Sequence, residues 1–279
     1  MNRIFSPSWP GAIAAIAITL TLAFGVHRAS RAVTQPNAAP LRLGTTGAFV
    51  PPLEAAVAEA KKQGLEVKLV EFSDWVTPNT SLANGDIDVN YFQHVPFLEN
   101  AKKQGHFDLV PYASGILNNV GLYSKKYKSF AELPEGAQAA IANDPVNSGR
   151  GLQLLAKAGL ITLKPGVGYK ATRDDVVTNP KHLRIVEVEA VQLVRAYDDA
   201  DLVQGYPAYI RLAKTFEPQS ALLFDGLDHK EYVIQFVIRP ESHDDPRLHQ
   251  FVDIYQHSPA VRKALDEAHG HLYQPGWEL

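Results

Sequence analysis

The stretch Gln138-Ala-Ala-Ile-Ala-Asn-Asp-Pro-Val-Asn-Ser-Gly-Arg-Gly151 holds the pattern that decides the fold. Residues 138–142 are mostly small and apolar and predict a buried strand, after which polar residues turn the chain into a helix expected over 151–158. Free backbone N–H groups at a helix start attract an anion. Arg150 adds a planar guanidinium that fits a carboxylate in two parallel hydrogen bonds, and Asn147 lies in the same turn. The alternative is an ordinary turn with a solvated arginine.

The same alternation of strands and helices continues on both sides of this stretch. Residues 52–63 carry an apolar stripe at helical spacing, and residues 65–72 predict a strand. Further strands are expected at 87–91, 120–124, 183–188, 201–205 and 232–238, and further helices at 95–104 and from Ser258. Strands that alternate with helices predict an α/β protein with mixed, mostly parallel sheets. In such sheets the ligand crevice lies at the carboxyl ends of the strands.

The composition is that of an ordinary globular protein. The chain has 279 residues, 46% of them hydrophobic, and a net charge of −3. Its length allows two lobes of about 100 residues each, and the lack of a basic excess argues against a nucleic-acid partner. The chain contains no cysteine, which excludes disulfides, thiolate zinc sites, a cysteine nucleophile and a lipid-modified cysteine.

The N-terminal segment predicts export. Arg3 precedes an apolar run over 12–26, which is too short for a comfortable membrane span and is typical of a signal peptide. Small residues at 30 and 32 predict cleavage after Ala32, so that residues 1–32 are a signal peptide and residues 33–40 a linker. The alternative is an uncleaved membrane anchor. We therefore expect a periplasmic protein that is not lipid-anchored.

Aromatic residues and a histidine accompany the strand expected at 87–91. Tyr91, Phe92 and His94 would suit a ligand with an apolar side chain and one polar handle. Trp75, near the end of the preceding strand, could extend the same wall. The alternatives are a histidine with a structural role and a tryptophan packed in the core.

Other motifs carry little weight. The segment 166–171 resembles a dinucleotide-binding pattern but lacks a strand before it and a long helix after it. His269-Gly-His271 could bind a metal, but its place near the C-terminus favours a solvated tail. His-Glu-x-x-His and Gly-x-Ser-x-Gly are both missing from the sequence. We therefore predict no cofactor, no metal site and no catalytic residues, so the protein is not expected to be an enzyme.

Several stretches together resemble the methionine-binding (NlpA-type) family of substrate-binding proteins of ABC importers. They are Phe72-Ser-Asp-Trp75 with Pro78-Asn79; Gly85-Asp-Ile-Asp88 with Phe92-Gln-His94; Tyr123-Ser-Lys-Lys126; Asn143-Asp-Pro145 with Asn147, Gly149 and Arg150; Asp175-Val-Val177 with Asn179-Pro180; and Glu187-Val-Glu-Ala190 with Gln192 and Leu193. Each is weak alone, but they follow the family's order over nearly all of residues 41–279.

The resemblance implies a two-lobed periplasmic-binding-protein fold of the type II kind with a hinge between the lobes. It implies delivery of a small ligand to an ABC permease that a cytoplasmic ATPase drives. In the family, the arginine that matches Arg150 holds the ligand carboxylate. The positions that match Trp75, Tyr91, Phe92 and His94 surround the ligand side chain.

Three departures from the family pattern concern the lipid anchor and the ligand. The lipobox cysteine is missing, and so are two asparagines that grip the methionine backbone. Tyr206 (or Gln204, if the register slips) stands at the first asparagine position and Ile234 at the second. The carboxylate end of the site is therefore expected to be kept and the amino end altered. Glu189, Asn119 or the Tyr206 hydroxyl could meet an ammonium group instead.

From these observations we expect a monomer with two lobes, lobe 1 from residues 41–124 and 230–279 and lobe 2 from 125–229. We expect weaker methionine binding than is usual in the family, with preference for a related carboxylate whose amino end is changed or absent. We also expect that replacing Arg150 would leave the stability of the empty protein nearly unchanged. The alternative functions are a ligand sensor or scaffold of the same fold and, less favoured, a two-lobed enzyme.

Overall fold

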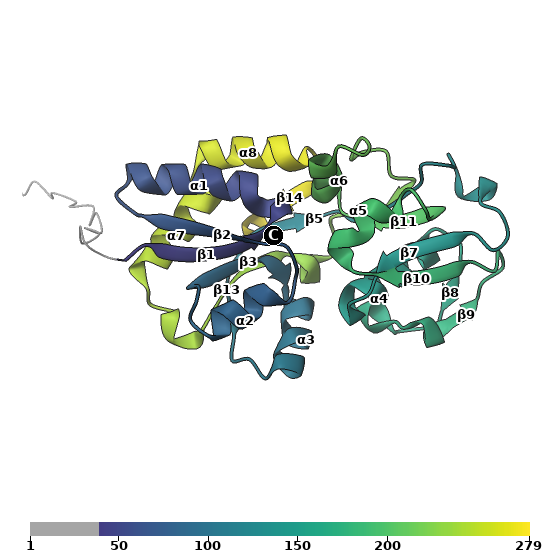
Figure 1. Ribbon diagram of the computed structural model, residues 1–279, viewed down its shortest axis with the longest axis horizontal. Coiled ribbons are helices and arrows are strands. Elements are labelled where there is room, and N and C mark those ends of the chain that lie inside the picture. The colour runs from purple at the N-terminus through teal and green to yellow at the C-terminus, as the bar shows by residue number, and fades with distance from the viewer. Residues whose placement is uncertain (1–38) are drawn as a thin grey trace, which may run out of the picture. The chain divides into compact units, whose positions relative to one another are not determined.

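The computed structural model describes residues 39–279 (Figure 1). The predicted signal peptide over 1–32 and most of the predicted linker lie outside the described residues. The helices are α1 (Val50–Lys62), α2 (Thr77–Ala83), α3 (Val95–Gly105), α4 (Pro145–Lys157), α5 (Leu193–Ala196), α6 (Pro207–Ala213), α7 (Pro246–His257) and α8 (Pro259–His269). The strands are β1 (Leu41–Thr46), β2 (Val67–Phe72), β3 (Val89–His94), β4 (Val110–Ser114), β5 (Ile116–Asn118), β6 (Gly121–Tyr123), β7 (Gln138–Ala142), β8 (Thr162–Leu163), β9 (Val176–Thr178), β10 (Arg184–Val188), β11 (Leu202–Gly205), β12 (Leu223–Phe224), β13 (Ile234–Ile238) and β14 (Tyr273–Pro275).

The first five-stranded sheet has the order β2-β1-β3-β13-β4. β1 pairs in parallel with β2 and β3, whereas β13 is antiparallel to β3 and β4. In Figure 1, α1, α7 and α8 lie on one side of this sheet and α2 and α3 on the other. Apolar side chains from both layers form the core, among them Leu53 of α1 and Phe251 of α7, which are fully buried. The helix predicted at 52–63 is confirmed as α1.

The second five-stranded sheet has the order β10-β7-β11-β6-β12. β7 pairs in parallel with β10 and β11, and β6 is antiparallel to β11 and β12. α4 contributes Leu152 and Leu155 to a core on this sheet, and α5 contributes Leu193 to another. The prediction of an α/β protein with mixed sheets is therefore confirmed.

Two segments cross between the sheets. Residues 119–120 lead from β5 to β6, and residues 225–233 lead from β12 to β13. β6 pairs within the second sheet, so the first crossing lies before Gly121 and not at the predicted boundary after Ser124. The reason is that β6 finds its partners in β11 and β12, which come 80 or more residues later and leave no local signal.

α4 begins earlier than the expected helix at 151–158. Pro145 occupies the first turn, and the Asp144 side chain caps the helix by accepting a hydrogen bond of 2.9 Å from the backbone N–H of Asn147. Proline and a capping aspartate are both favoured at a helix start. As a result, Asn147 and Arg150 lie within the first two turns of α4 rather than in the turn before it.

Within residues 39–279, no helix combines the length and hydropathy that crossing a bilayer requires.

Candidate functional site

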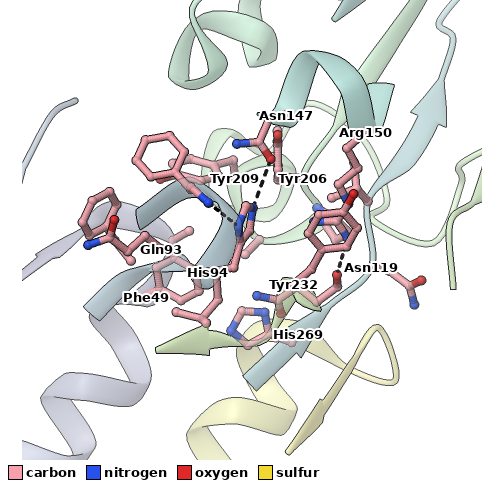
Figure 2. A pocket seen from close by; sticks show the side chains of 18 of the residues that line it. Phe49, Gln93, His94, Asn119, Asn147, Arg150, Tyr206, Tyr209, Tyr232 and His269 are labelled. Carbon is pink, nitrogen blue, oxygen red and sulfur yellow. Dashed lines mark hydrogen bonds between the residues drawn. The ribbon is translucent and has the colours of Figure 1, made fainter. Parts of the chain in front are cut away.

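A cavity lies where residues of both sheets meet at the carboxyl ends of β3 and β7, as expected for an α/β fold. It encloses about 640 Å³, a volume that includes the solvent at its opening. Its polar and charged lining residues are Gln93, His94, Asn118, Asn119, Asn147, Arg150 and His269. Its aromatic lining residues are Phe49, Trp75, Phe92, Phe97, Tyr206, Tyr209 and Tyr232 (Figure 2).

Arg150 is buried at this cavity, with 4% of its surface exposed. Its Nε and Nη2 both lie 2.6 Å from Oδ2 of Asp225, and Nη2 donates a second hydrogen bond of 3.0 Å to the Asn118 carbonyl. The guanidinium carbon lies 4.0 Å from the centre of the Tyr232 ring, which is a cation–π contact. Figure 2 labels both residues. Burial excludes the alternative of a solvated arginine. Neither Asp225 nor Tyr232 was among the site residues predicted from the sequence.

His94 ends β3 and caps α3. Its Nδ1 accepts a hydrogen bond of 3.2 Å from the backbone N–H of Phe97, so the ring proton resides on Nε2, which lies 3.4 Å from Oδ1 of Asn147 (Figure 2). Burial, helped by the positive charge of Arg150, lowers the pKa of His94 to about 3. His94 is therefore a neutral donor, and it joins α3 to α4 across the cavity.

Asn147 is held in place by Asp144. The Asn147 side-chain amide donates to both carboxylate oxygens of Asp144 at 3.1 Å, which leaves its carbonyl oxygen directed at His94. Burial raises the pKa of Asp144, although the hydrogen bonds from Asn147 oppose this effect. Asn147 therefore contributes an oriented amide to the lining.

The aromatic wall is centred on Trp75. Its ring meets those of Tyr206 and Phe97 edge to face, with centroids 5.4 and 6.2 Å apart. The indole N–H donates to the Tyr209 hydroxyl at 3.0 Å, and that hydroxyl donates to Oγ1 of Thr46 at 2.9 Å. The indole hydrogen bond is thus satisfied within the wall, and the rings offer apolar surface to a ligand.

Of the nine residues predicted for the site, the structure brings seven to the cavity: Trp75, Phe92, His94, Asn119, Asn147, Arg150 and Tyr206. Tyr91 is not among its lining residues. Its hydroxyl lies 2.8 Å from that of Tyr255 and accepts a hydrogen bond of 3.1 Å from the backbone N–H of Ile116, and burial raises its pKa. Neighbouring side chains along a strand point to opposite faces of the sheet. This alternation predicts that Tyr91 and Phe92 do not both face the cavity.

Glu189 is also outside the cavity. It is exposed and directly precedes a 3-10 helix over Ala190–Gln192, so it does not meet a ligand bound there. Asn119 lines the cavity, but its Oδ1 accepts a hydrogen bond of 2.9 Å from the backbone N–H of Gly226. Asn119 therefore ties the two crossing segments together.

The two positions at which family asparagines were expected both reach the cavity. Tyr206 and Ile234 line it, whereas Gln204 is fully buried behind it and bonds to the backbone of Ala142 and Asn147. The structure thus places Tyr206 at the cavity rather than Gln204. Neither Tyr206 nor Ile234 supplies an amide to the lining.

His269 does not lie in a solvated tail, contrary to the sequence prediction. It ends α8, is 2% exposed and lines the cavity. After it, β14 folds the C-terminus back by pairing with β5. Burial, with the charge of Arg211, lowers the pKa of His269 to about 4. Its Nε2 has no hydrogen-bond partner among the residues described, and residues 39–279 contain no group of three potential ligands that could hold a metal.

Comparison with known proteins gives consistent matches. The NlpA lipoprotein family matches over residues 41–277. The "D-methionine-binding lipoprotein MetQ" of Escherichia coli K12 is 43% identical over 231 residues, which cover 80% of this chain and 83% of the relative. A crystal structure of the methionine-binding protein MetQ has a TM-score of 0.82 at 38% identity and covers 87% of this chain and 99% of its own. A nutrient-binding protein of Burkholderia cenocepacia, solved bound to methionine, has a TM-score of 0.77 at 34% identity and covers 84% and 99%.

These matches correct the predicted localisation. The matching family and the E. coli relative are both named lipoproteins, which points to attachment through a lipid. The prediction of a periplasmic protein that is not lipid-anchored is therefore wrong. That prediction relied on the lack of cysteine in the chain, an argument from composition that the names of the relatives overturn.

Proposed function

The chain belongs to the NlpA lipoprotein family, and from this premise we propose that it is the substrate-binding component of an ABC importer, which captures methionine or a related small carboxylate. It has the fold of the periplasmic substrate-binding proteins. The MetQ relatives are named for methionine binding. We further propose that it delivers the ligand to a membrane permease that a cytoplasmic ATPase drives.

The observation that supports this function most directly is a buried arginine beside an aromatic wall in one cavity. Arg150 has no recorded hydrogen bond at Nη1 within residues 39–279, so this nitrogen can donate to a ligand oxygen. Trp75, Phe97 and Tyr206 offer ring edges and faces to a slim apolar side chain. A thioether sulfur beside such rings gains about 0.3–1.5 kcal/mol per contact.

The amino end of the ligand has weaker support in this cavity. Ile234 cannot form a hydrogen bond through its side chain, and none of the described residues that line the cavity is an acid. Burying an ammonium group without a partner is costly. We therefore propose that methionine binds more weakly here than its family would suggest.

We propose that the two sheets form the two lobes and that the crossing segments form the hinge. Residues 119–120 and 225–226 are tied by hydrogen bonds from Asp225 N–H to the Val120 carbonyl and from Gly226 N–H to Asn119, both 2.9 Å long. A short paired hinge allows rigid lobes to close over a ligand. On this proposal β6 belongs to lobe 2, and the C-terminal helices α7 and α8 belong to lobe 1.

The proposed function is tested by identifying the ligand. We expect mass spectrometry of the denatured protein to release a small carboxylate, and calorimetry to detect L-methionine binding with a Kd well above the nanomolar range. D-methionine and the 2-hydroxy analogue of methionine are measured for comparison, because they differ from L-methionine in the position or presence of the amino group. Nanomolar L-methionine binding would show that Tyr206 and Ile234 do not weaken the amino end. A folded protein that binds none of these compounds would not have the proposed function.

A further inference from the structure

Asp225 determines what Arg150 can do. Its Oδ2 takes up the Nε and Nη2 edge of the guanidinium, each at 2.6 Å, which is the edge that would otherwise hold a ligand carboxylate in two parallel bonds. The Asn118 carbonyl accepts the remaining Nη2 hydrogen at 3.0 Å. Both side chains are buried, with 5% and 8% of their side-chain surfaces exposed. Within residues 39–279, Nη1 is therefore the guanidinium nitrogen left without a hydrogen bond, on an arginine whose charge is already balanced.

Asp225 is held beside Arg150 by hydrogen bonds to its side chain and to its backbone. Its Oδ1 accepts a hydrogen bond of 2.8 Å from the backbone N–H of Val120, and its own backbone N–H donates to the Val120 carbonyl at 2.9 Å. Nζ of Lys157 donates to the Asp225 carbonyl at 2.6 Å. Three hydrogen bonds, two of them to Val120, thus hold Asp225 in place as the counter-ion of Arg150.

Asp225 therefore balances the charge that Arg150 brings to the cavity. Among the lining residues within 39–279, Arg150 alone carries a permanent charge, and Asp225 offsets it. His94 and His269 are buried and make no contact with an acid that would favour their charged forms. A ligand with a net negative charge would place a second carboxylate around one guanidinium in a poorly solvated site, where like charges repel strongly.

We propose that Asp225 is a specificity-determining residue, which makes this site select ligands without a net negative charge. This inference rests on the proposed function. It admits a zwitterionic amino acid or a ligand whose carboxylate is replaced by an uncharged acceptor such as an amide. It disfavours a simple anionic carboxylate and so revises the expectation that an analogue without the amino group would bind best.

The test compares two ligands that differ only in the charge of the carboxylate. They are the 2-hydroxy analogue of methionine and the primary amide of that same hydroxy acid. We expect the wild-type protein to bind the amide at least as tightly as the acid in calorimetry. Asp225→Asn keeps the side-chain shape and removes the charge, so it should raise the ratio of acid to amide affinity by about tenfold or more. Asp228→Asn removes the same charge from an exposed position in the same loop and should change neither affinity by more than about twofold.

If Asp225 had a purely structural role, Asp225→Asn would lower the affinities for the acid and for the amide by the same factor. That result would overturn the proposal. If Asp225→Asn fails to fold, the wild-type comparison decides alone: preference for the acid by about a hundredfold would show that Arg150 acts as an unpaired cation. A preference for the acid of this size would still be compatible with the proposed function, which is the capture of a small carboxylate. A folded wild-type protein that binds neither compound nor L-methionine would overturn the proposed function and this inference together.

Discussion

Arg150 is a buried cation that depends on one carboxylate for its charge balance, which changes the expected effect of removing it. Without the guanidinium, Asp225 stays buried at 6% exposure with only the Val120 N–H as a partner for its side chain. The expectation that replacing Arg150 would leave stability unchanged assumed that its guanidinium has no partner in the ligand-free protein. The recorded ion pair contradicts that assumption.

We expect Arg150→Met to lower the free energy of unfolding by about 3–5 kcal/mol, because it leaves an uncompensated buried charge. The double variant Arg150→Met/Asp225→Asn should recover part of this loss, since it removes the stranded charge. Denaturant unfolding of the ligand-free proteins measures both effects. Arg173→Met serves as a control, because Arg173 is 58% exposed and lies 3.8 Å from Glu187. A double variant no more stable than the single one would contradict this account.

At the scale of elements, α4 approaches its neighbours closely at two glycines. A Cβ at Gly149 would lie 2.1 Å from the Tyr169 carbonyl oxygen, and one at Gly151 would lie 2.6 Å from Oε1 of Gln204. The segment 166–171, which resembles a nucleotide-binding pattern in sequence, instead includes a 3-10 helix at Gly168–Lys170 beside α4. The two glycines let α4 pack with its first turns, which carry Asn147 and Arg150, against the end of β7.

Alanine is the better helix former, yet we expect Gly149→Ala to destabilise the protein by about 1–3 kcal/mol, because the backbone of Tyr169 must move. Ligand affinity should fall as well, since the same shift displaces Arg150. Thermal unfolding and calorimetry measure the two effects. Gln153→Ala, a half-exposed position in the same helix, is the matched control and should change stability little. A more stable Gly149→Ala protein would mean that this contact is not tight.

At the scale of the whole molecule, the cavity draws residues from both sheets and from both crossing segments, so ligand binding is coupled to the position of the lobes. His94 and Asn147 meet across the cavity at 3.4 Å, which joins the first sheet to α4. Trp75 and Tyr206 form a second contact between the lobes. The hydrogen bonds from Trp75 to Tyr209 and from Tyr209 to Thr46 also join the lobes. Such non-covalent contacts can break when the hinge opens.

We therefore expect a saturating ligand to decrease the radius of gyration measured by X-ray scattering, because it favours the closed arrangement. Arg150→Met should show little decrease at the same ligand concentration if it folds. Identical scattering curves with and without a ligand of confirmed affinity would argue against closure.

Local sequence patterns determined the elements of this protein. Residues 138–142 form β7 as predicted, and residues 52–63 lie close to α1, because apolar periodicity and capping residues act over a few positions. The same local signals marked Arg150 and the aromatic residues after β3 as a binding region. Family motifs then indicated the type of ligand.

Only the tertiary structure decided which side chains meet. Asp225 lies 75 residues after Arg150, and Tyr209 lies 134 residues after Trp75, so neither pairing leaves a pattern that spacing could reveal. His269 enters the cavity because the C-terminus folds back through β14, which pairs with β5. Charge balance at a buried site depends on such distant partners. For this reason the sequence could indicate the arginine, whereas the fold decided how much of its charge a ligand can use.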